Sequence, residues 1–190
     1  MRGGNPKLFP CRKRQSYVLR GVSAFAVMTV AVGCSSGEAT REFTIPKNLC
    51  GVSVPTDALS RLLPASGENL DVQQDGDIDE GNELCVLSVD DTQVLMVSRE
   101  RINTGDSAEH VLISRARVSQ QKTADDGAIA YANRAAVSLI KCRGAGIEVE
   151  DISTFIKVLK PARSDETAMK DLITDYTATY KKQRPCLPGS

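Results

Sequence analysis

Hydrophobic positions recur at helical spacing in two parts of this chain. Early in the chain, three leucines predict a short helix over residues 55–64, with Thr56 as its N-terminal cap and Pro64 at its end. Late in the chain, a longer helix is predicted to begin at Ser164, whose hydroxyl can cap the first turn. Its apolar stripe consists of Met169, Leu172, Ile173, Tyr176 and Tyr180. Both helices are therefore expected to bury one face in a core.

Shorter apolar runs, rich in β-branched residues, predict strands between these helices. The expected strands are residues 84–89, 92–97, 128–131, 135–142 and 152–159. Residues 111–118 fit either a strand or a short helix, whereas 68–83 and 119–127 are polar and are expected to be loops. The pattern predicts an α+β fold: an antiparallel sheet of about five to six strands, a short N-terminal helix and a longer C-terminal one.

The first 33 residues have the three parts of an export signal. Six basic residues and no acidic one precede an apolar stretch over residues 22–32, and small residues lead to Gly33-Cys34. The stretch is shorter than the roughly 20 residues that span a bilayer, which favours a cleaved signal over an uncleaved anchor or a core helix. We expect cleavage between Gly33 and Cys34 and two acyl chains on Cys34, enough for stable anchoring to the extracytoplasmic face of a bacterial membrane.

This interpretation divides the chain into a lipoprotein signal peptide (residues 1–33), a flexible tether (34–45) and a single α+β domain (46–190). The whole chain has 24 basic and 24 acidic residues. Because all six basic residues of the signal leave with it, eighteen basic residues then face twenty-four acidic ones. Such an acidic domain is not expected to bind nucleic acid, which requires clustered Lys and Arg.

Six cysteines divide according to the same interpretation. Cys11 leaves with the signal and Cys34 carries lipid, so four remain in an oxidising compartment, widely spaced and without a C-x-x-C pair. Two structural disulfides are therefore expected. Four cysteines permit three pairings, and we favour Cys50–Cys85 with Cys142–Cys186, because each pair brackets one contiguous block of predicted elements.

Few residues suggest chemistry. The one histidine, His110, is expected on the surface or at a sheet edge, and no nucleophile motif or zinc ligand set accompanies it. The acidic run from Asp75 resembles the start of a calcium loop, but Glu80 stands where glycine is needed and Val86 where a bidentate Glu is needed. A solvated loop is favoured over weak calcium binding. We assign no catalytic residue, no metal ligand and no cofactor.

Several of these features occur together in one class of protein. They are the Gly33-Cys34 signal end, Leu49-Cys50, the runs Glu83-Leu84-Cys85-Val86 and Leu139-Ile140-Lys141-Cys142, and a last helix before Cys186. In this combination the chain resembles small cell-envelope lipoproteins of actinobacteria with no assigned activity. The resemblance implies a compact α+β domain cross-linked by cysteines and a membrane anchor at Cys34. We expect a non-enzymatic module that binds an envelope protein or a small ligand; the alternative is an envelope hydrolase with convergent carboxylates.

Overall fold

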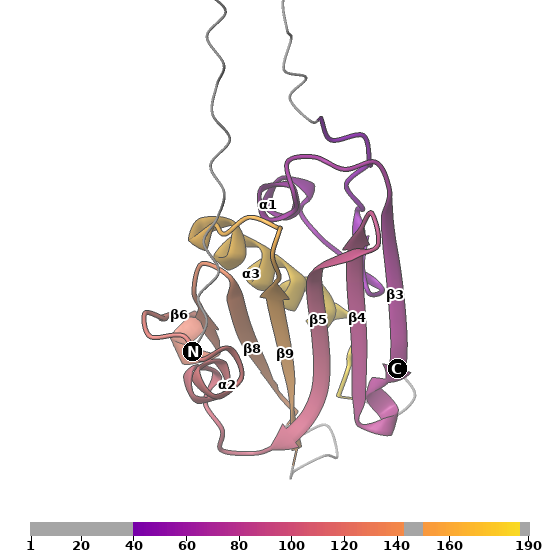
Figure 1. Cartoon of the computed structure of the whole chain (residues 1–190). Helices are drawn as coiled ribbons and strands as arrows, with labels where there is room; N and C mark the ends of the chain where they lie inside the picture. The colour runs from indigo at the N-terminus through magenta and orange to yellow at the C-terminus, as the bar shows by residue number, and fades with distance from the viewer. Residues whose placement is uncertain (1–39, 143–149, 187–190) are drawn as a thin grey trace, which may run out of the picture. The chain divides into compact units, whose positions relative to one another are not determined.

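The computed structural model describes residues 40–142 and 150–186. Cys34, the Gly33–Cys34 junction and Cys11 lie outside the described residues. The domain is α+β, with one antiparallel seven-stranded sheet in the order β3-β4-β5-β9-β8-β7-β6 (Figure 1). These strands are β3 (Leu70–Asp77), β4 (Asn82–Val89), β5 (Thr92–Asn103), β6 (Lys122–Ala124), β7 (Ile129–Tyr131), β8 (Ala135–Lys141) and β9 (Glu150–Val158). Two short strands, β1 (Asn48–Leu49) and β2 (Val52–Ser53), form a separate pair.

Two helices cover one face of the sheet. They are α1 (Thr56–Leu62) and α3 (Glu166–Lys182), and α3 lies behind the strands in Figure 1. The predicted stripe of α3 is confirmed, since all five of its residues are buried in the main core. The caps differ from the prediction. The carboxylate of Asp165, not the Ser164 hydroxyl, accepts from the N–H of Ala168, and Pro55 precedes Thr56, which is the first helical residue of α1.

The third helix lies on the opposite face. Residues 111–118, for which strand and helix were both open, belong largely to α2 (Ala108–Ala116), which is capped by Ser107. Its apolar side packs on β7, β8 and β9 and forms a second, smaller core. The main members of this core are Val111, Leu112, Val137, Leu139 and Phe155. Because α2 is short, it covers only this part of its face.

Both predicted disulfides are present. Cys50 in the β1–β2 turn bonds to Cys85 on β4, and Cys142 after β8 bonds to Cys186 after α3. The first fastens the small strand pair to the sheet, and the second fastens the chain beyond α3. The bonds close loops of 35 and 44 residues. Loops of this size stabilise the fold by about 4 kcal/mol each in the chain-entropy treatment of the unfolded state.

Two segments that were expected to be loops contain strands. Half of the acidic segment 68–83 is the edge strand β3, and β6 lies within 119–127, so the sheet has seven strands where five to six were predicted. Seven of the eight residues of β3 are exposed. Because neither face of this strand is buried in a core, its sequence lacks the alternation of apolar side chains that predicts a strand. Acidic side chains on an edge strand also discourage pairing with other chains.

Part of the expected tether packs against the domain. Phe43 is buried in the main core. The Arg41 guanidinium donates to the Ser60 hydroxyl at 2.6 Å and to the carbonyl oxygens of Ser60 and Pro64, both at 2.9 Å, at the end of α1. The packed chain therefore starts before residue 46. In the two described stretches, no helix has the length and apolar character needed to cross a bilayer.

Candidate functional site

A large part of one sheet face has no helix of the described chain over it. Strand alternation places two acidic residues of β3, two apolar residues of β4 and Met96 of β5 on the side that carries α2. We call this surface the open face; its residues are Asp71, Gln73, Asp75, Leu84, Val86, Ser88, Met96, Ser98, Glu100 and Lys157. Leu84 is 38% exposed, and Val86 and Met96 are half-buried.

A groove runs between the open face and α2. Its volume is about 580 Å³, and Leu84, Met96 and Ser98 line it on the sheet side. Arg115 of α2 lines the groove on the helix side. Its guanidinium group pairs with Glu100, and the guanidinium carbon lies 5.6 Å from the centre of the Phe155 ring. The groove is therefore bounded by a charged pair on the α2 side and is apolar at its floor.

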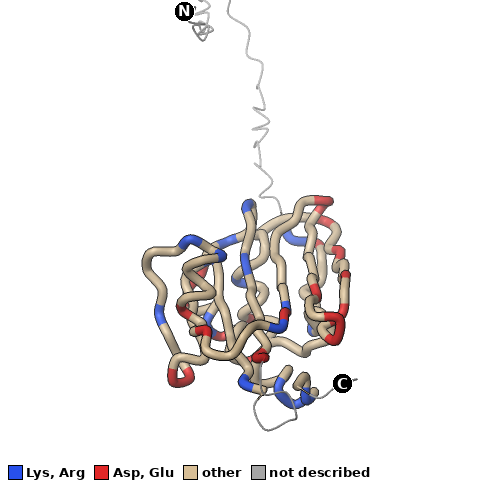
Figure 2. The backbone as a smooth tube through the Cα atoms, turned by 90° about the horizontal axis from the view of Figure 1, so that it is seen from below, with Lys and Arg blue, Asp and Glu red and all other residues tan. Residues whose placement is uncertain are grey.

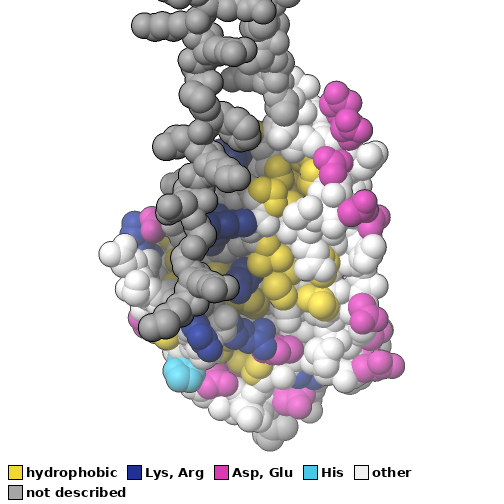
Figure 3. Space-filling model, in the orientation of Figure 1, with side chains coloured by type: hydrophobic (Ala, Val, Ile, Leu, Met, Phe, Trp, Pro, Cys, Tyr) yellow, Lys and Arg dark blue, Asp and Glu magenta, His cyan; other side chains and the backbone are white. Residues whose placement is uncertain are grey.

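Charges of opposite sign flank the apolar centre. Figure 3 shows hydrophobic side chains down the middle of this face, acidic ones towards β3 and basic ones towards α2. From below, Figure 2 shows the acidic positions gathered along the β3 side. Among the described residues, neither the Lys157 nor the Asp75 side chain has a hydrogen-bond or ion-pair partner, and the Asp71 side chain accepts only from Gln73, at 2.9 Å. The open face therefore carries unpaired charge of both signs.

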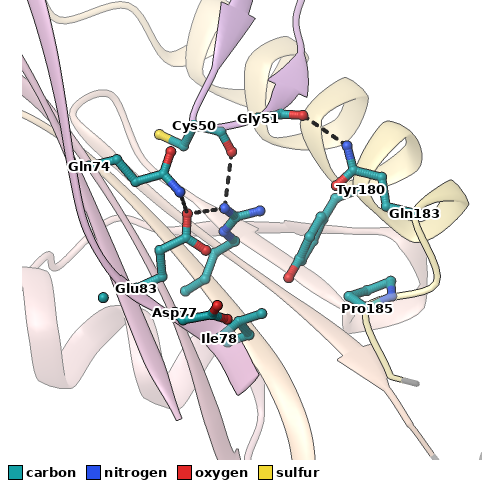
Figure 4. Close-up of a pocket in the computed structure, with 11 residues that line it drawn as sticks. Cys50, Gly51, Gln74, Asp77, Ile78, Glu83, Tyr180, Gln183 and Pro185 are labelled. Carbon is teal, nitrogen blue, oxygen red and sulfur yellow. Dashed lines mark hydrogen bonds and ion pairs between the residues drawn. The ribbon is translucent and has the colours of Figure 1, made fainter. Parts of the chain in front are cut away.

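A second feature is a polar pocket of about 200 Å³ on the other side of the sheet. It lies between the β1–β2 turn, the ends of β3 and β4, and the end of α3 (Figure 4). At its base, buried Glu83 pairs with buried Arg99 and also accepts from Gln74 Nε2 at 2.7 Å. Arg99 Nη2 donates to the Cys50 carbonyl oxygen at 3.0 Å.

The end of α3 closes this pocket. The ring of Tyr180 lies against Arg99, with the guanidinium carbon 4.6 Å from the ring centre, which is a cation–π contact. Gln183 Nε2 donates to the Gly51 carbonyl oxygen at 2.9 Å (Figure 4). These contacts tie the helix to the turn that carries Cys50. The pocket thus serves as a structural joint, in which the ion pair holds three segments together.

Burial sets the protonation of the tyrosines here. It raises the pKa of Tyr176 above its usual range, and Glu83 adds to the effect while Arg99 opposes it. Burial likewise raises the pKa of Tyr180. Burial by itself would lower the pKa of Arg99, but Tyr176, Glu83 and Tyr180 outweigh it and the pKa is raised. At neutral pH the joint therefore contains a charged arginine and two neutral phenols.

The residues singled out from the sequence do not converge. His110 is exposed on α2, and the carboxylates that follow Asp75 are spread along β3 and the helical turn Ile78–Glu80. Residues 40–142 and 150–186 contain no group of His, Cys, Asp or Glu side chains suited to a metal ion. Of the described carboxylates, Glu83 and Asp151 are buried; Glu83 pairs with Arg99, and Asp151 accepts from the Cys142 N–H at 3.2 Å.

Neither the ion pair nor the open face was predicted from the sequence. The sequence did contain a signal for the pair. Glu83 lies on the same face of its strand as buried Cys85 and Leu87, and Arg99 on the same face as buried Leu95 and Val97. A charged residue at a core-facing position of each neighbouring strand indicates a buried partner. The open face had no such signal, because it depends on β9 lying between β5 and β8.

No family model, curated protein or solved structure matches this chain. Of the two features, the polar joint is occupied by its own residues, whereas the open face carries exposed apolar area and unpaired charge. Large exposed apolar patches on folded domains mark interaction sites.

The raised tyrosine pKa values predict a loss of stability at alkaline pH. A group whose pKa is raised by folding stabilises the fold below its unfolded pKa, which is about 10 for tyrosine, and loses that contribution as the pH rises. We expect the free energy of unfolding to fall above about pH 10, by at most about 1.4 kcal/mol per pH unit for each tyrosine. Urea unfolding at pH 8 to 11 measures it.

The matched variant for this measurement is Tyr176→Phe. Within residues 40–142 and 150–186 the buried Tyr176 hydroxyl has no hydrogen-bond partner, so its removal is expected to leave stability at pH 8 unchanged or raised by about 1 kcal/mol. The slope above pH 10 should become shallower in the variant. An unchanged slope would show that Tyr176 titrates normally in the folded protein and that its environment is not as described.

Proposed function

We propose that this chain is a lipid-anchored extracytoplasmic lipoprotein of the bacterial cell envelope, and that its domain is a non-enzymatic binding module. The open face is the binding surface in this proposal. The resemblance to actinobacterial envelope lipoproteins belongs to the same proposal. Its partner is an envelope protein or a small ligand, and the attachment to the membrane is through Cys34.

The cysteines support the proposed location outside the cytoplasm. Four of the six are joined in two disulfides, and such bonds persist in oxidising compartments outside the cytoplasm. Of the other two, Cys34 directly follows the small residues that end the signal pattern. Stable anchoring needs two acyl chains, because a single chain gives only marginal membrane binding. Lipid on Cys34 is thus the anchor that this proposal requires.

One observation carries the binding role: one exposed and two half-buried apolar side chains lie at the centre of the open face, with unpaired charges beside them. Leu84, Val86 and Met96 form this centre, and Asp75 and Lys157 are the unpaired charges. A desolvated apolar centre with a polar rim is the anatomy of a protein interface. Both buried carboxylates of the described residues are engaged, so they lend no support to a hydrolase.

The anchor is tested by replacing the cysteine that would carry lipid. Cys34→Ser is expected to abolish incorporation of labelled palmitate and to release the protein from the membrane fraction. Cys11→Ser is the matched control, because Cys11 leaves with the signal and its loss should change neither result. Unchanged labelling and fractionation of Cys34→Ser would contradict a lipid anchor at this residue.

The binding surface is tested by a photo-crosslinking amino acid introduced in cells. Placed at Leu84, in the open face, it is expected to give crosslinked adducts on irradiation. Placed at Lys170, which is exposed on α3 on the opposite side of the sheet, it should give none. Equal yields at the two positions, or none at Leu84, would count against the open face as a binding surface.

A further inference from the structure

The open face is complementary to itself. We infer that it binds the open face of a second copy of this chain, with a two-fold axis that runs parallel to the strands. The inference rests on the proposed function, because it names the partner of the same surface and uses the same membrane anchor. A two-fold interface requires one patch that matches itself after rotation, and this can be checked from the strand register.

The register places the charges in rows across the sheet. Gln73 is opposite Val86, Val86 is opposite Met96, and Met96 is opposite Lys157, so these four residues form one row. Asp71 and Asp75 lie two residues to either side of Gln73 on β3. Lys157 therefore lies level with the middle of the acidic column, three strands away from it, or about 14 Å at usual strand spacing.

A two-fold axis parallel to the strands, passing between β4 and β5, keeps each row at its level and exchanges the two sides of the patch. It brings Lys157 of each copy opposite Gln73 of the other, between Asp71 and Asp75. A two-fold axis perpendicular to the strands would instead place the acidic column against the acidic column. The charge layout thus selects the parallel axis, because like charges brought together cost free energy.

The apolar centre and the shape agree with this axis. Leu84 and Val86 of one copy then face Met96 and Ser98 of the other, as in two sheets packed face to face about 10 Å apart. Helix α2, which stands over β7 and β8, falls outside the edge strand β3 of the second copy. The rotation therefore places α2 beside the other sheet, where it does not obstruct contact between the faces.

The membrane anchor also agrees with this axis. Thr40, the first described residue, lies at the end of the sheet that holds the β4–β5 turn, because its carbonyl oxygen accepts from Gly67 N at 3.4 Å and the next residue, Glu68, donates to Asp90. Only five residues separate Thr40 from Cys34, at most about 3.5 Å each. A parallel axis keeps both Thr40 residues at the same end, so both copies reach one membrane.

The test uses the full lipidated chain in membranes, co-expressed as two copies with different C-terminal tags. Purification of one tag after mild detergent extraction measures how much of the other copy comes with it. Wild-type copies are expected to co-purify. Two samples test the charges: Lys157→Glu in both copies, and the double variant Asp71→Lys/Asp75→Lys in both copies. Each replaces attraction by repulsion at both symmetry-related contacts and should reduce co-purification at least about tenfold.

The decisive sample mixes the two kinds of variant. When Lys157→Glu is paired with Asp71→Lys/Asp75→Lys, every contact again joins opposite charges, so co-purification should return towards the wild-type level. Lys170→Glu, on α3, is the matched control and should behave as wild type. Intact disulfides on non-reducing gels verify that each variant is folded.

Two results would overturn the second copy as partner: wild-type copies that do not co-purify, or a mixed pair that is not restored. If the crosslinker at Leu84 still captures a different envelope protein, the binding module stands and its partner is that protein. If neither copies nor adducts are found, the proposed binding surface falls together with the inference.

Discussion

The whole arrangement depends on one constraint, which is that a broad sheet has two faces to cover. In the part of the chain that the structure describes, three helices share this task, and α1 and α3 both lie on the same face. The short α2 covers only β7, β8 and part of β9 on the other. The front of β3, β4 and β5 is left without a helix. The open face follows from this unequal division, and so do its exposed apolar residues.

The covered face is held by a polar joint at one end. There Glu83 and Arg99 are buried as a pair, and Arg99 also contacts the Cys50 carbonyl and the Tyr180 ring. Such a pair is a weak source of net stability, yet losing one partner typically costs about 3 to 5 kcal/mol. Its contribution is geometric, because its contacts join the end of α3 to the turn that carries Cys50. The open face therefore lies on a sheet whose far side is fastened to α3 and to the Cys50 turn.

Local patterns predicted the elements that bury apolar side chains. The stripe of α3, the β4–β5 hairpin and the pairing of Cys50 with Cys85 and of Cys142 with Cys186 all agree with the structure. Strand β3 escaped prediction because an exposed edge imposes no apolar alternation. The open face escaped it because it is non-local: Lys157 and Asp75 come to flank the same apolar centre only after β9 is inserted beside β5.

Solvent exposure of individual methyl groups tests this unequal coverage most directly. In a dilute sample of the Cys34→Ser protein, a soluble paramagnetic probe should strongly relax the methyl groups of Leu84, Val86 and Met96. It should leave those of Leu87 and Val97, which are buried on the covered face, nearly unaffected. Equal protection of the two sets would contradict the account, because it would show that the front of β3, β4 and β5 is covered by the chain itself.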